Sequence, residues 1–403
     1  MRRVVITGLG CVAPPGKSVP EFWSAMVAGR SSIGKYPQAV PEPIGHVVLA
    51  PVLNFNVEDQ FDSKRLVLLD RFSFFALVAA REAVKDAGLV LTDAERPRAA
   101  VVLGSGIGGN TTHEEQYLRL IGAKTLRVHP LTIPKLMLNA ATSQLTMEFG
   151  MMGPAYSISS ACASANHAIG QAFWFVRSGL CDVALTGGSE ACLTIGTVKA
   201  WEALRVMSND TCRPFAKDRR GMVLGEGGAV IVLETLERAQ ARGAKIYCEI
   251  VGFGMSSDAG DIVYPDEKGA AAAMAAALKD GGLAPSDIDY VNAHGTGTTA
   301  NDATETAAIK RVFGGEAKRL AVSSTKSMHG HALGAAGAIE IVAAVKAIET
   351  GVVPPTANYT EQDPECDLDY VPNAARQMKV RAAISNSFAF GGLNAVVALK
   401  SLA

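Results

Sequence analysis

The sequence predicts an α/β fold in which helices are layered on a largely parallel sheet. Runs rich in β-branched residues recur along the chain, and several of them end at a glycine. Helical patterns lie between these runs, and strands that alternate with helices are typical of α/β layers. The strand-like runs include residues 4–8, 100–104, 183–187, 230–233 and 246–252, and the helical patterns include residues 71–88 and 269–281.

The composition supports a large buried core and excludes several classes of protein. Hydrophobic residues make up 48% of the 403 residues and charged residues 19%, which excludes intrinsic disorder. The net charge of −1 argues against nucleic acid as the main partner, because phosphate binding needs a basic excess. No apolar run reaches the roughly 18 residues of a membrane span. The seven cysteines are scattered and form no C-x-x-C pair, so we expect a reduced, cytoplasmic protein.

Two segments far apart in the chain are similar in sequence. Residues 159–170 align without gaps on residues 323–334, and five of the twelve positions are identical. Two Ser-rich helix starts could be alike by chance, since such residues are common there. Alternatively, the chain contains an internal duplication with a boundary near Gly243. In that case Cys162 and Lys326 would occupy equivalent helix starts and could face one site.

Cys162 follows a strand-like segment and opens an Ala-rich helix. A thiol at a helix N-terminus feels the positive end of the helix dipole, which favours the thiolate. The backbone N–H groups there can also receive an oxyanion. The alternative is a small buried thiol with a structural role, the usual state of a free cysteine.

Three further segments carry candidate site residues. His294 ends a strand-like run beside Thr296 and Thr298, and is either a site residue or a satisfied core histidine. His329 and His331 follow Lys326 and could be two metal ligands, but the other Cys and His residues supply no regular ligand set. Residues 386–394 contain glycines that could aim an N–H at a substrate oxygen, although alone they read as a hairpin.

Residues 104–109 match the G-x-G-x-x-G pattern of dinucleotide-binding loops after a strand. The acidic residue that such a site needs about 20 residues further on is missing, because residues 120–130 contain no acid. We therefore predict a tight turn over a pocket, and a nicotinamide-binding protein is the least favoured alternative.

Taken in order, these segments resemble the β-ketoacyl-ACP synthases of the thiolase superfamily, most closely the elongating type II enzymes. The match covers essentially the whole chain. Residues 201–206, 211–215, 305–314 and 354–359 resemble the nodulation-type branch, which makes specialised, often polyunsaturated, acyl chains.

The resemblance implies a thiolase-like five-layer αβαβα fold of two duplicated halves, usually in a homodimer. Residues 1–243 would carry the nucleophile and residues 244–403 both catalytic histidines. The implied activity joins an acyl chain held on Cys162 to malonyl-ACP, giving 3-oxoacyl-ACP, CO2 and free ACP. The substrates would be carried on the phosphopantetheine of an acyl carrier protein, with no cofactor and no metal. A chain-length-factor-like subunit of a heterodimer is the alternative, although such partners usually lack the nucleophile.

The resemblance also assigns a role to each matching residue. Cys162 would be acylated, His294 and His331 would promote decarboxylation of malonyl-ACP, and Lys326 would set the electrostatics of the site with Glu305. The assigned residues are completed by the oxyanion and gate residues Cys162, Phe388 and Phe390, the phosphopantetheine-binding Thr296 and Thr298, the acyl-pocket residue Ile107, and the carrier-docking residues Lys64, Arg65 and Arg205.

The chain departs from the family pattern near its end. Ala389 stands where the family usually has glycine, and Leu393 replaces the usual threonine. A methyl group at residue 389 is expected to stiffen the gate, and Leu393 removes a hydroxyl. A degradative thiolase is disfavoured, because it would need a second catalytic cysteine in this region and the last one here is Cys366.

Overall fold

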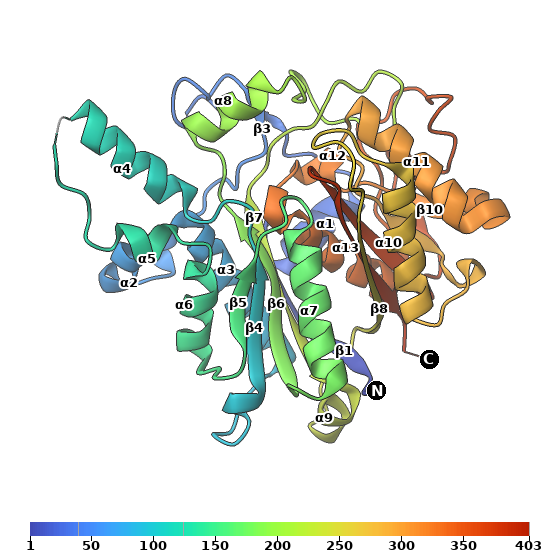
Figure 1. Ribbon diagram of the computed structural model, residues 1–403, viewed down its shortest axis with the longest axis horizontal. Coiled ribbons are helices and arrows are strands. Elements are labelled where there is room, and N and C mark those ends of the chain that lie inside the picture. The colour runs from blue at the N-terminus through green and yellow to red at the C-terminus, as the bar shows by residue number, and fades with distance from the viewer. Residues whose placement is uncertain (39, 124, 403) are drawn as a thin grey trace.

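A computed structural model of the chain describes residues 1–38, 40–123 and 125–402, and its centre is a ten-stranded sheet (Figure 1). The strand order is β10-β9-β13-β14-β8-β1-β7-β6-β4-β5. The strands are β1 (Val4–Val12), β4 (Ala99–Gly104), β5 (Ala155–Ile158), β6 (Val183–Glu190), β7 (Gly227–Thr235), β8 (Cys248–Ser257), β9 (Tyr290–Asn292), β10 (Ala321–Ser323), β13 (Ala382–Ala389) and β14 (Leu393–Lys400).

The sheet consists of two halves with the same topology. In each half the five strands, numbered by their order in the chain, lie in the order 3-2-4-5-1. The first and second halves meet where β1 pairs antiparallel with β8, through Val4 with Ile250 and Ile6 with Cys248. This shared order confirms the duplicated halves that the repeat predicts.

The prediction of a largely parallel sheet is wrong, because the sheet is mixed. Strands β9, β10 and β13 are parallel, as are β4, β5 and β6, but the five strand pairs from β13 to β6 across the middle are antiparallel. The physical reason is visible in the second half, where Gly391 and Gly392 reverse the chain between β13 and β14. A tight hairpin of this kind joins antiparallel neighbours, whereas parallel neighbours need a long crossover.

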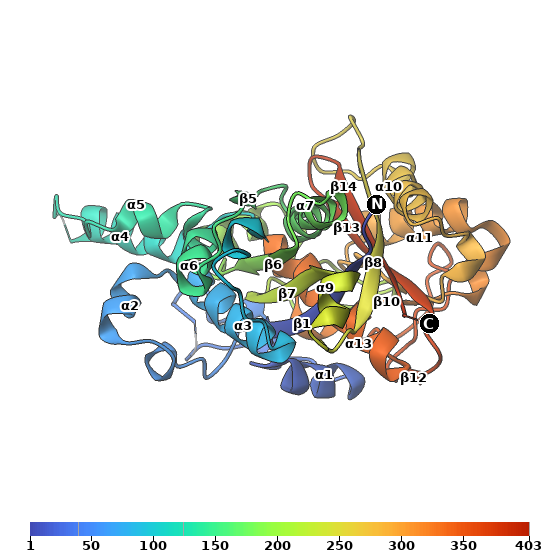
Figure 2. The same cartoon turned by 90° about the horizontal axis from the view of Figure 1, so that it is seen from below.

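Helices form three layers around the two halves of the sheet (Figures 1 and 2). Helices α7 and α13 contact each other and pack between the halves, α3 covers β1, β6 and β7, and α10 covers β8 and β14 with α11 beside it. These helices are α3 (Arg71–Ala87), α7 (Ser164–Ser178), α10 (Glu267–Asp280), α11 (Thr299–Phe313) and α13 (Ala336–Thr350). The arrangement is the αβαβα layering that the family resemblance implies.

The remaining elements lie around this core. The helices are α1 (Val19–Val27), α2 (Ser63–Leu68), α4 (Asn110–Gly122), α5 (Thr132–Leu136), α6 (Ala140–Phe149), α8 (Ile195–Ala203), α9 (Leu236–Ala241) and α12 (Lys326–His329), and the short strands are β2 (Gly34–Lys35), β3 (Val48–Leu49), β11 (Val352–Val353) and β12 (Arg376–Gln377). Among the described residues, no helix combines the length and apolar character needed to cross a membrane.

Where β1 meets α3, close packing explains why the strand has glycine at residues 8 and 10. A Cβ atom on Gly10 would lie 1.8 Å from the carbonyl oxygen of Ala79, and one on Gly8 would lie 2.1 Å from that of Ala83. No side chain fits at either position, so the helix backbone rests directly on the strand. Tight contact of this kind lets three helical layers and two sheet halves fit into one chain.

The two repeat segments occupy equivalent places in the two halves. Residues 159–170 follow β5, and residues 323–334 start at the end of β10, so each segment follows the third strand of its half. In the first half the helix α7 then runs without interruption. In the second half Gly330, with φ +69°, ends the short α12 and α13 begins only at Ala336. The break places His331 in a short extended segment, where it forms an isolated β-bridge with Leu224, instead of on a helix face.

Candidate active site

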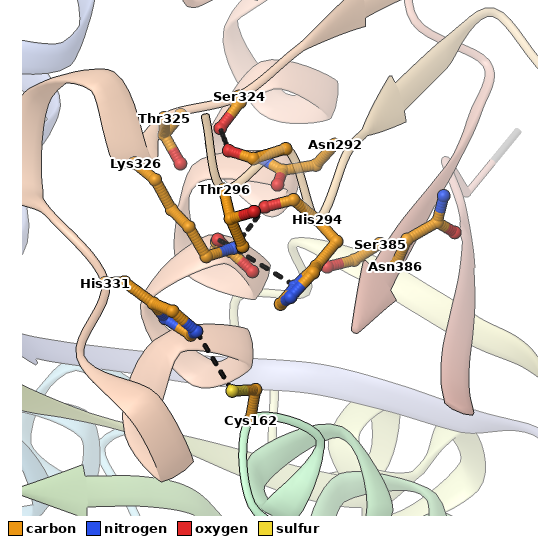
Figure 3. Close-up of polar contacts among 12 residues, drawn as sticks. Cys162, Asn292, His294, Thr296, Ser324, Thr325, Lys326, His331, Ser385 and Asn386 are labelled. Carbon is orange, nitrogen blue, oxygen red and sulfur yellow. Dashed lines mark hydrogen bonds and ion pairs between the residues drawn. The ribbon is translucent and has the colours of Figure 1, made fainter. Parts of the chain in front are cut away.

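Cys162 lies in a tight turn between β5 and α7, and its side chain is buried (Figure 3). The preceding residue, Ala161, has φ +48°, a left-handed conformation that is strained for any residue with a Cβ atom. The Cys162 Sγ atom is 3.0 Å from Nε2 of His331. A thiol and an imidazole are thus brought together from the two halves of the molecule.

The thiol of Cys162 is neutral in the free protein, contrary to the thiolate that its place before a helix favours. Burial is the main cause that raises the thiol pKa to about 12, while Lys326 lowers it and Glu190 raises it further. Burial also holds the pKa of His331 well below its ordinary value, with Lys326 as the second cause. A neutral imidazole can accept the thiol proton directly, so activation needs no preformed thiolate.

His294 follows β9 and is held by its backbone. Its N–H and that of Gly295 donate to the two carboxylate oxygens of Glu305, at 2.8 and 2.7 Å. The Nζ atom of Lys326 donates to the carbonyl oxygen of His294 at 2.6 Å and lies 3.4 Å from its Nδ1. An ammonium group can only donate, so Nδ1 is the acceptor and Nε2 carries the proton. Burial, then Lys326, holds the pKa of His294 well below its ordinary value.

The carboxylate that pairs with Lys326 is Glu340, a residue that the sequence analysis did not single out. Both side chains are fully buried and form an ion pair through Lys326 Nζ and Glu340 Oε1. Glu305, which was expected to support Lys326, instead binds backbone N–H groups and the side-chain amide of Asn386. One signal could have revealed Glu340, namely a lone acidic residue in the otherwise apolar middle of α13.

The site contains a cavity of about 380 Å³. Cys162, His294 and His331 lie in it together with Phe388 and Phe390. Thr296 and Thr298 also line it, and their hydroxyls are 2.9 Å apart. The sequence-predicted nucleophile, both histidines, both threonines and both gate residues therefore meet at one place.

The gate segment is the turn between β13 and β14, where Phe390 stacks on Trp201 of α8 with ring centroids 5.6 Å apart. The N–H of Gly391 donates to the carbonyl of Ile262 at 2.8 Å, and Asn394 donates to Asp258 at 2.7 Å. Ala389 is buried and pairs with Leu393 across the hairpin. The two residues that depart from the family pattern thus face each other at the base of the gate.

The acyl-pocket and docking residues are more dispersed. Ile107 is 38% exposed and is not among the residues that line the cavity. Arg205 lines the cavity mouth, next to Arg220. Lys64 and Arg65 lie on α2 outside the cavity lining, and Arg65 forms an ion pair with Glu148. Of the three docking residues, only Arg205 is brought to the cavity.

The glycine loop, residues 104–109, binds the side-chain carboxylate of Glu190 through its backbone N–H groups. The N–H groups of Gly106 and Ile107 donate to the carboxylate of Glu190 at 2.6 and 3.2 Å. In a dinucleotide site such N–H groups would face the pyrophosphate. The G-x-G-x-x-G pattern is therefore a turn over a buried carboxylate, in agreement with the expectation of a tight turn.

One group of side chains has the spacing of metal ligands. One atom each of Cys162, His294 and His331 lies within 4.8 Å of the other two. A sulfur and two imidazoles are donors that zinc accepts. The same three groups are also suited to nucleophilic and general acid–base chemistry without an ion.

The sequence and structure are similar to those of known condensing enzymes. Residues 1–239 match the model of the beta-ketoacyl synthase N-terminal domain and residues 247–360 that of the C-terminal domain. The chain is 50% identical to "Nodulation protein E" of Rhizobium sp. (strain N33), with 100% of both chains covered. It is 44% identical to "3-oxoacyl-[acyl-carrier-protein] synthase 2" of Staphylococcus aureus (strain N315), covering 99% of this chain and 98% of the other.

A solved structure described as "The ishigamide ketosynthase/chain length factor" superimposes with a TM-score of 0.95 at 36% identity, with 100% of both chains covered. A type II polyketide ketosynthase solved in complex with its acyl-carrier protein superimposes with a TM-score of 0.91 at 35% identity, again over both whole chains. With matching domain models, full-length relatives and the same fold, this chain belongs to the β-ketoacyl synthase family.

Proposed function

We propose that the protein is a 3-oxoacyl-[acyl-carrier-protein] synthase that extends an acyl chain held on Cys162 with malonyl-ACP. The observation that carries the proposal is the 3.0 Å contact between Cys162 Sγ and His331 Nε2 inside a cavity that also holds His294. The relatives named above act, by their printed descriptions, on acyl-carrier-protein substrates or belong to nodulation. Fatty-acid synthesis and a specialised lipid or polyketide pathway both fit this reaction.

In the first half-reaction the Cys162 thiol gives its proton to Nε2 of His331 as the sulfur attacks the carbonyl of the acyl thioester. The backbone N–H groups of Cys162 and Phe390 receive the oxyanion that forms. The phosphopantetheine thiolate leaves and takes up the proton, so that the acyl chain remains on Cys162. Splitting one condensation into two transfers lowers the barrier of each.

In the second half-reaction malonyl-ACP loses CO2, and the electron pair of the broken C–C bond becomes an enolate. His294 presents its Nε2–H because its Nδ1 faces Lys326, and it donates to the enolate oxygen. His331 joins it in the tautomer that carries its proton on Nε2, which is available once Cys162 is acylated and no longer donates to this nitrogen. The carbanion then attacks the acyl-Cys162 carbonyl, and the Cys162 thiolate leaves and takes up a proton from water. The pantetheine arm would lie against Thr296 and Thr298, and none of these steps requires a cofactor or a metal.

The acyl carrier protein is the proposed partner, docked by Arg205 at the cavity mouth and by Lys64. A second copy of the chain is the other proposed partner. Strand β5 ends the sheet, and the α4–α5 segment carries several exposed apolar residues. These residues are Tyr117, Leu118, Ile121, Leu126, Val128 and Ile133. A partner that covered this surface would bury an apolar area unusual for a monomer.

The test is to incubate the protein with acyl-ACP and malonyl-ACP and to weigh the carrier-bound products and the protein. We expect 3-oxoacyl-ACP and an acyl adduct on Cys162. The Cys162→Ala variant should form neither, whereas Cys181→Ala, which removes a buried thiol outside the cavity, should form both. Elongation at the wild-type rate by Cys162→Ala would overturn the proposal. Absence of any covalent acyl adduct on the wild-type protein would favour a chain-length-factor-like subunit.

A further inference from the structure

Glu190 is a buried carboxylate that the proposed reaction does not use. It is the last residue of β6, its side chain is fully buried, and it lies beside the nucleophile turn. No ion pair to Glu190 is found within the described part of the chain. Burying a charge without a counter-ion is costly, so a carboxylate retained here needs strong hydrogen bonds.

Four donors from two distant segments supply these hydrogen bonds. From the glycine loop, the N–H groups of Gly106 and Ile107 donate at 2.6 and 3.2 Å, and the Ser105 hydroxyl donates at 3.2 Å. From the turn that follows His331, the N–H of Gly334 donates at 3.1 Å. One carboxylate therefore fastens a loop of the first half to a turn of the second half.

One segment is hydrogen-bonded to the turn that holds Cys162, and the other follows His331 in the chain. The hydroxyl of Ser159, at the start of the nucleophile turn, donates to the carbonyl of Gly106 at 3.3 Å. Gly334 lies three residues after His331, in the 3₁₀ turn Leu333–Ala335 that follows it. The segments also touch each other, since a Cβ atom on Gly334 would lie 2.2 Å from the backbone nitrogen of Gly106 and 2.7 Å from Glu190 Oε2. The contacts leave no room for the two segments to shift independently.

We propose that Glu190 is a positioning residue for the condensation reaction, which holds Cys162 and His331 at reacting distance through its four hydrogen bonds. This inference rests on the proposed function, because it assumes that Cys162 takes the acyl chain. The hydrogen bonds carry the geometric effect, and the charge of the same carboxylate adds an electrostatic effect that experiment can separate from it.

The electrostatic effect depends on the groups that face Glu190. Burial is the main cause that raises the thiol pKa of Cys162 and that of Cys192, which follows β6, and the charge of Glu190 raises both further. Lys326 lowers the pKa of Cys162, and Glu340 raises it. Burial raises the pKa of Glu190 itself to about 7, against the hydrogen bonds that lower it. Above neutral pH the carboxylate is charged and disfavours a second negative charge on Cys162.

Two substitutions separate the two effects. Glu190→Gln removes the charge and, with one acceptor oxygen, cannot serve four donors. Glu190→Asp keeps the charge but is one methylene shorter. Glu234→Gln is the matched control, since Glu234 is equally buried but lies near the opposite end of the neighbouring strand β7. For each protein, the pH profile of Cys162 alkylation by iodoacetamide is measured beside the rate of acylation by acyl-ACP.

The expected result for Glu190→Gln is opposite changes in the two rates. Alkylation should shift to lower pH and become roughly threefold faster at pH 8, while acylation should fall tenfold or more. Glu190→Asp should keep the wild-type alkylation profile and still lose acylation, and Glu234→Gln should change neither. Parallel loss of both rates in Glu190→Gln, or no change in either, would overturn the proposal.

Two further measurements distinguish a failure of the positioning role from a variant that does not fold and from a failure of the proposed function. If Glu190→Gln is not recovered folded, Ser105→Ala removes one of the four donors, and acylation should then fall two- to fivefold with an unchanged alkylation profile. Wild-type acylation rates for folded Ser105→Ala would overturn the positioning role. If the wild-type protein itself is not acylated on Cys162, the proposed function fails before the role of Glu190 is reached.

Discussion

At the scale of single residues, the site combines neutral imidazoles with one buried ammonium group. Lys326 is fully buried, and its charge helps to lower the pKa of both His294 and His331. A protonated imidazole could not accept the thiol proton of Cys162, so the charge of Lys326 keeps the base available. The neighbouring Glu340 balances that charge without approaching the sulfur as a hydrogen-bond partner.

A His331 that stays neutral down to pH 6 is the first consequence of this arrangement. Because burial holds the pKa of His331 well below its ordinary value, this imidazole should cause no loss of Cys162 acylation by acyl-ACP from pH 8 to pH 6. An imidazole with an unperturbed pKa would lose about fourfold of its neutral form by pH 6. Single-turnover acylation of Glu190→Gln measures this, because in the wild type the carboxyl of Glu190, with a pKa of about 7, titrates in the same range. We expect a level profile for this variant, and a midpoint near 6.5 would contradict the expectation.

Removing Glu340 should destabilise the fold strongly. The Glu340→Ala variant leaves the fully buried Lys326 without its ion partner, and breaking such a pair typically costs about 3–5 kcal/mol. Urea unfolding at pH 8 measures the loss. Glu349→Ala on the same helix is the control, since that carboxylate pairs with the half-exposed Lys245 at the surface and should cost no more than about 1 kcal/mol. Equal losses in the two variants would show that burial of the pair is unimportant.

The candidate catalytic residues are easier to predict from the sequence than the residues that support them. Cys162 and His294 follow strands, and all three residues, His331 included, stand beside glycine or hydroxyl residues, a pattern that the sequence itself displays. Glu340 and Glu190 stand in an apolar helix and at the end of a strand, and their partners lie in distant segments. Only the packing of the two halves reveals what these carboxylates bind. Likewise, the strand-to-helix position of Cys162 suggests a thiolate, but the degree of burial that raises its pKa is a property of the tertiary structure.

At the scale of elements, the hairpin of β13 and β14 acts as one side of the cavity. Its turn is tied to residues 258–266 by backbone and side-chain hydrogen bonds, and to α8 by the stack of Phe390 on Trp201. The sequence predicts this hairpin from its glycines. It does not predict the antiparallel centre of the sheet, because strand direction depends on which distant strands pair.

Release of Phe390 should make Cys162 easier to reach. An aromatic stack contributes about 0.5–1.5 kcal/mol, so Trp201→Ala should increase the open population of the gate by roughly two- to tenfold. The expected readout is faster alkylation of Cys162 by a bulky maleimide at constant pH. Trp174→Ala, which removes an aromatic contact with Phe253, is the control and should leave the rate unchanged. Equal rates for Trp201→Ala and the wild type would show that the stack does not restrain the gate.

At the scale of the whole molecule, the two halves contribute different parts of one site. The first half supplies Cys162, and the second supplies His294, Lys326 and His331. The division near Gly243 remains a prediction from the sequence. The sequence repeat shows that the halves are related, but it does not show that their equivalent helix starts converge, which follows from the packing of α7 against α13.

Self-association through the edge strand is expected at this scale. Tyr156 on β5 is 37% exposed, and Ile121 and Ile133 of the α4–α5 segment are 75% and 60% exposed. We expect the wild-type protein to be a dimer by light scattering at micromolar concentration, and Ile133→Glu to shift it towards monomer because an unpaired charge would be buried. Ile262→Glu, at the cavity mouth, is the control. A monomeric wild-type protein would contradict the expectation.

The pairing of Cys162 with His331 across the two halves also has a consequence for the chain during its synthesis and folding. During synthesis the first half, with its thiol, emerges before the base that activates it exists. In a nascent or misdocked chain, Cys162 has neither this base nor the burial that raises its pKa, so it behaves as an ordinary exposed thiol. The paired thiol and imidazole exist only when both halves have folded and docked, so acyl transfer at this site requires the complete fold.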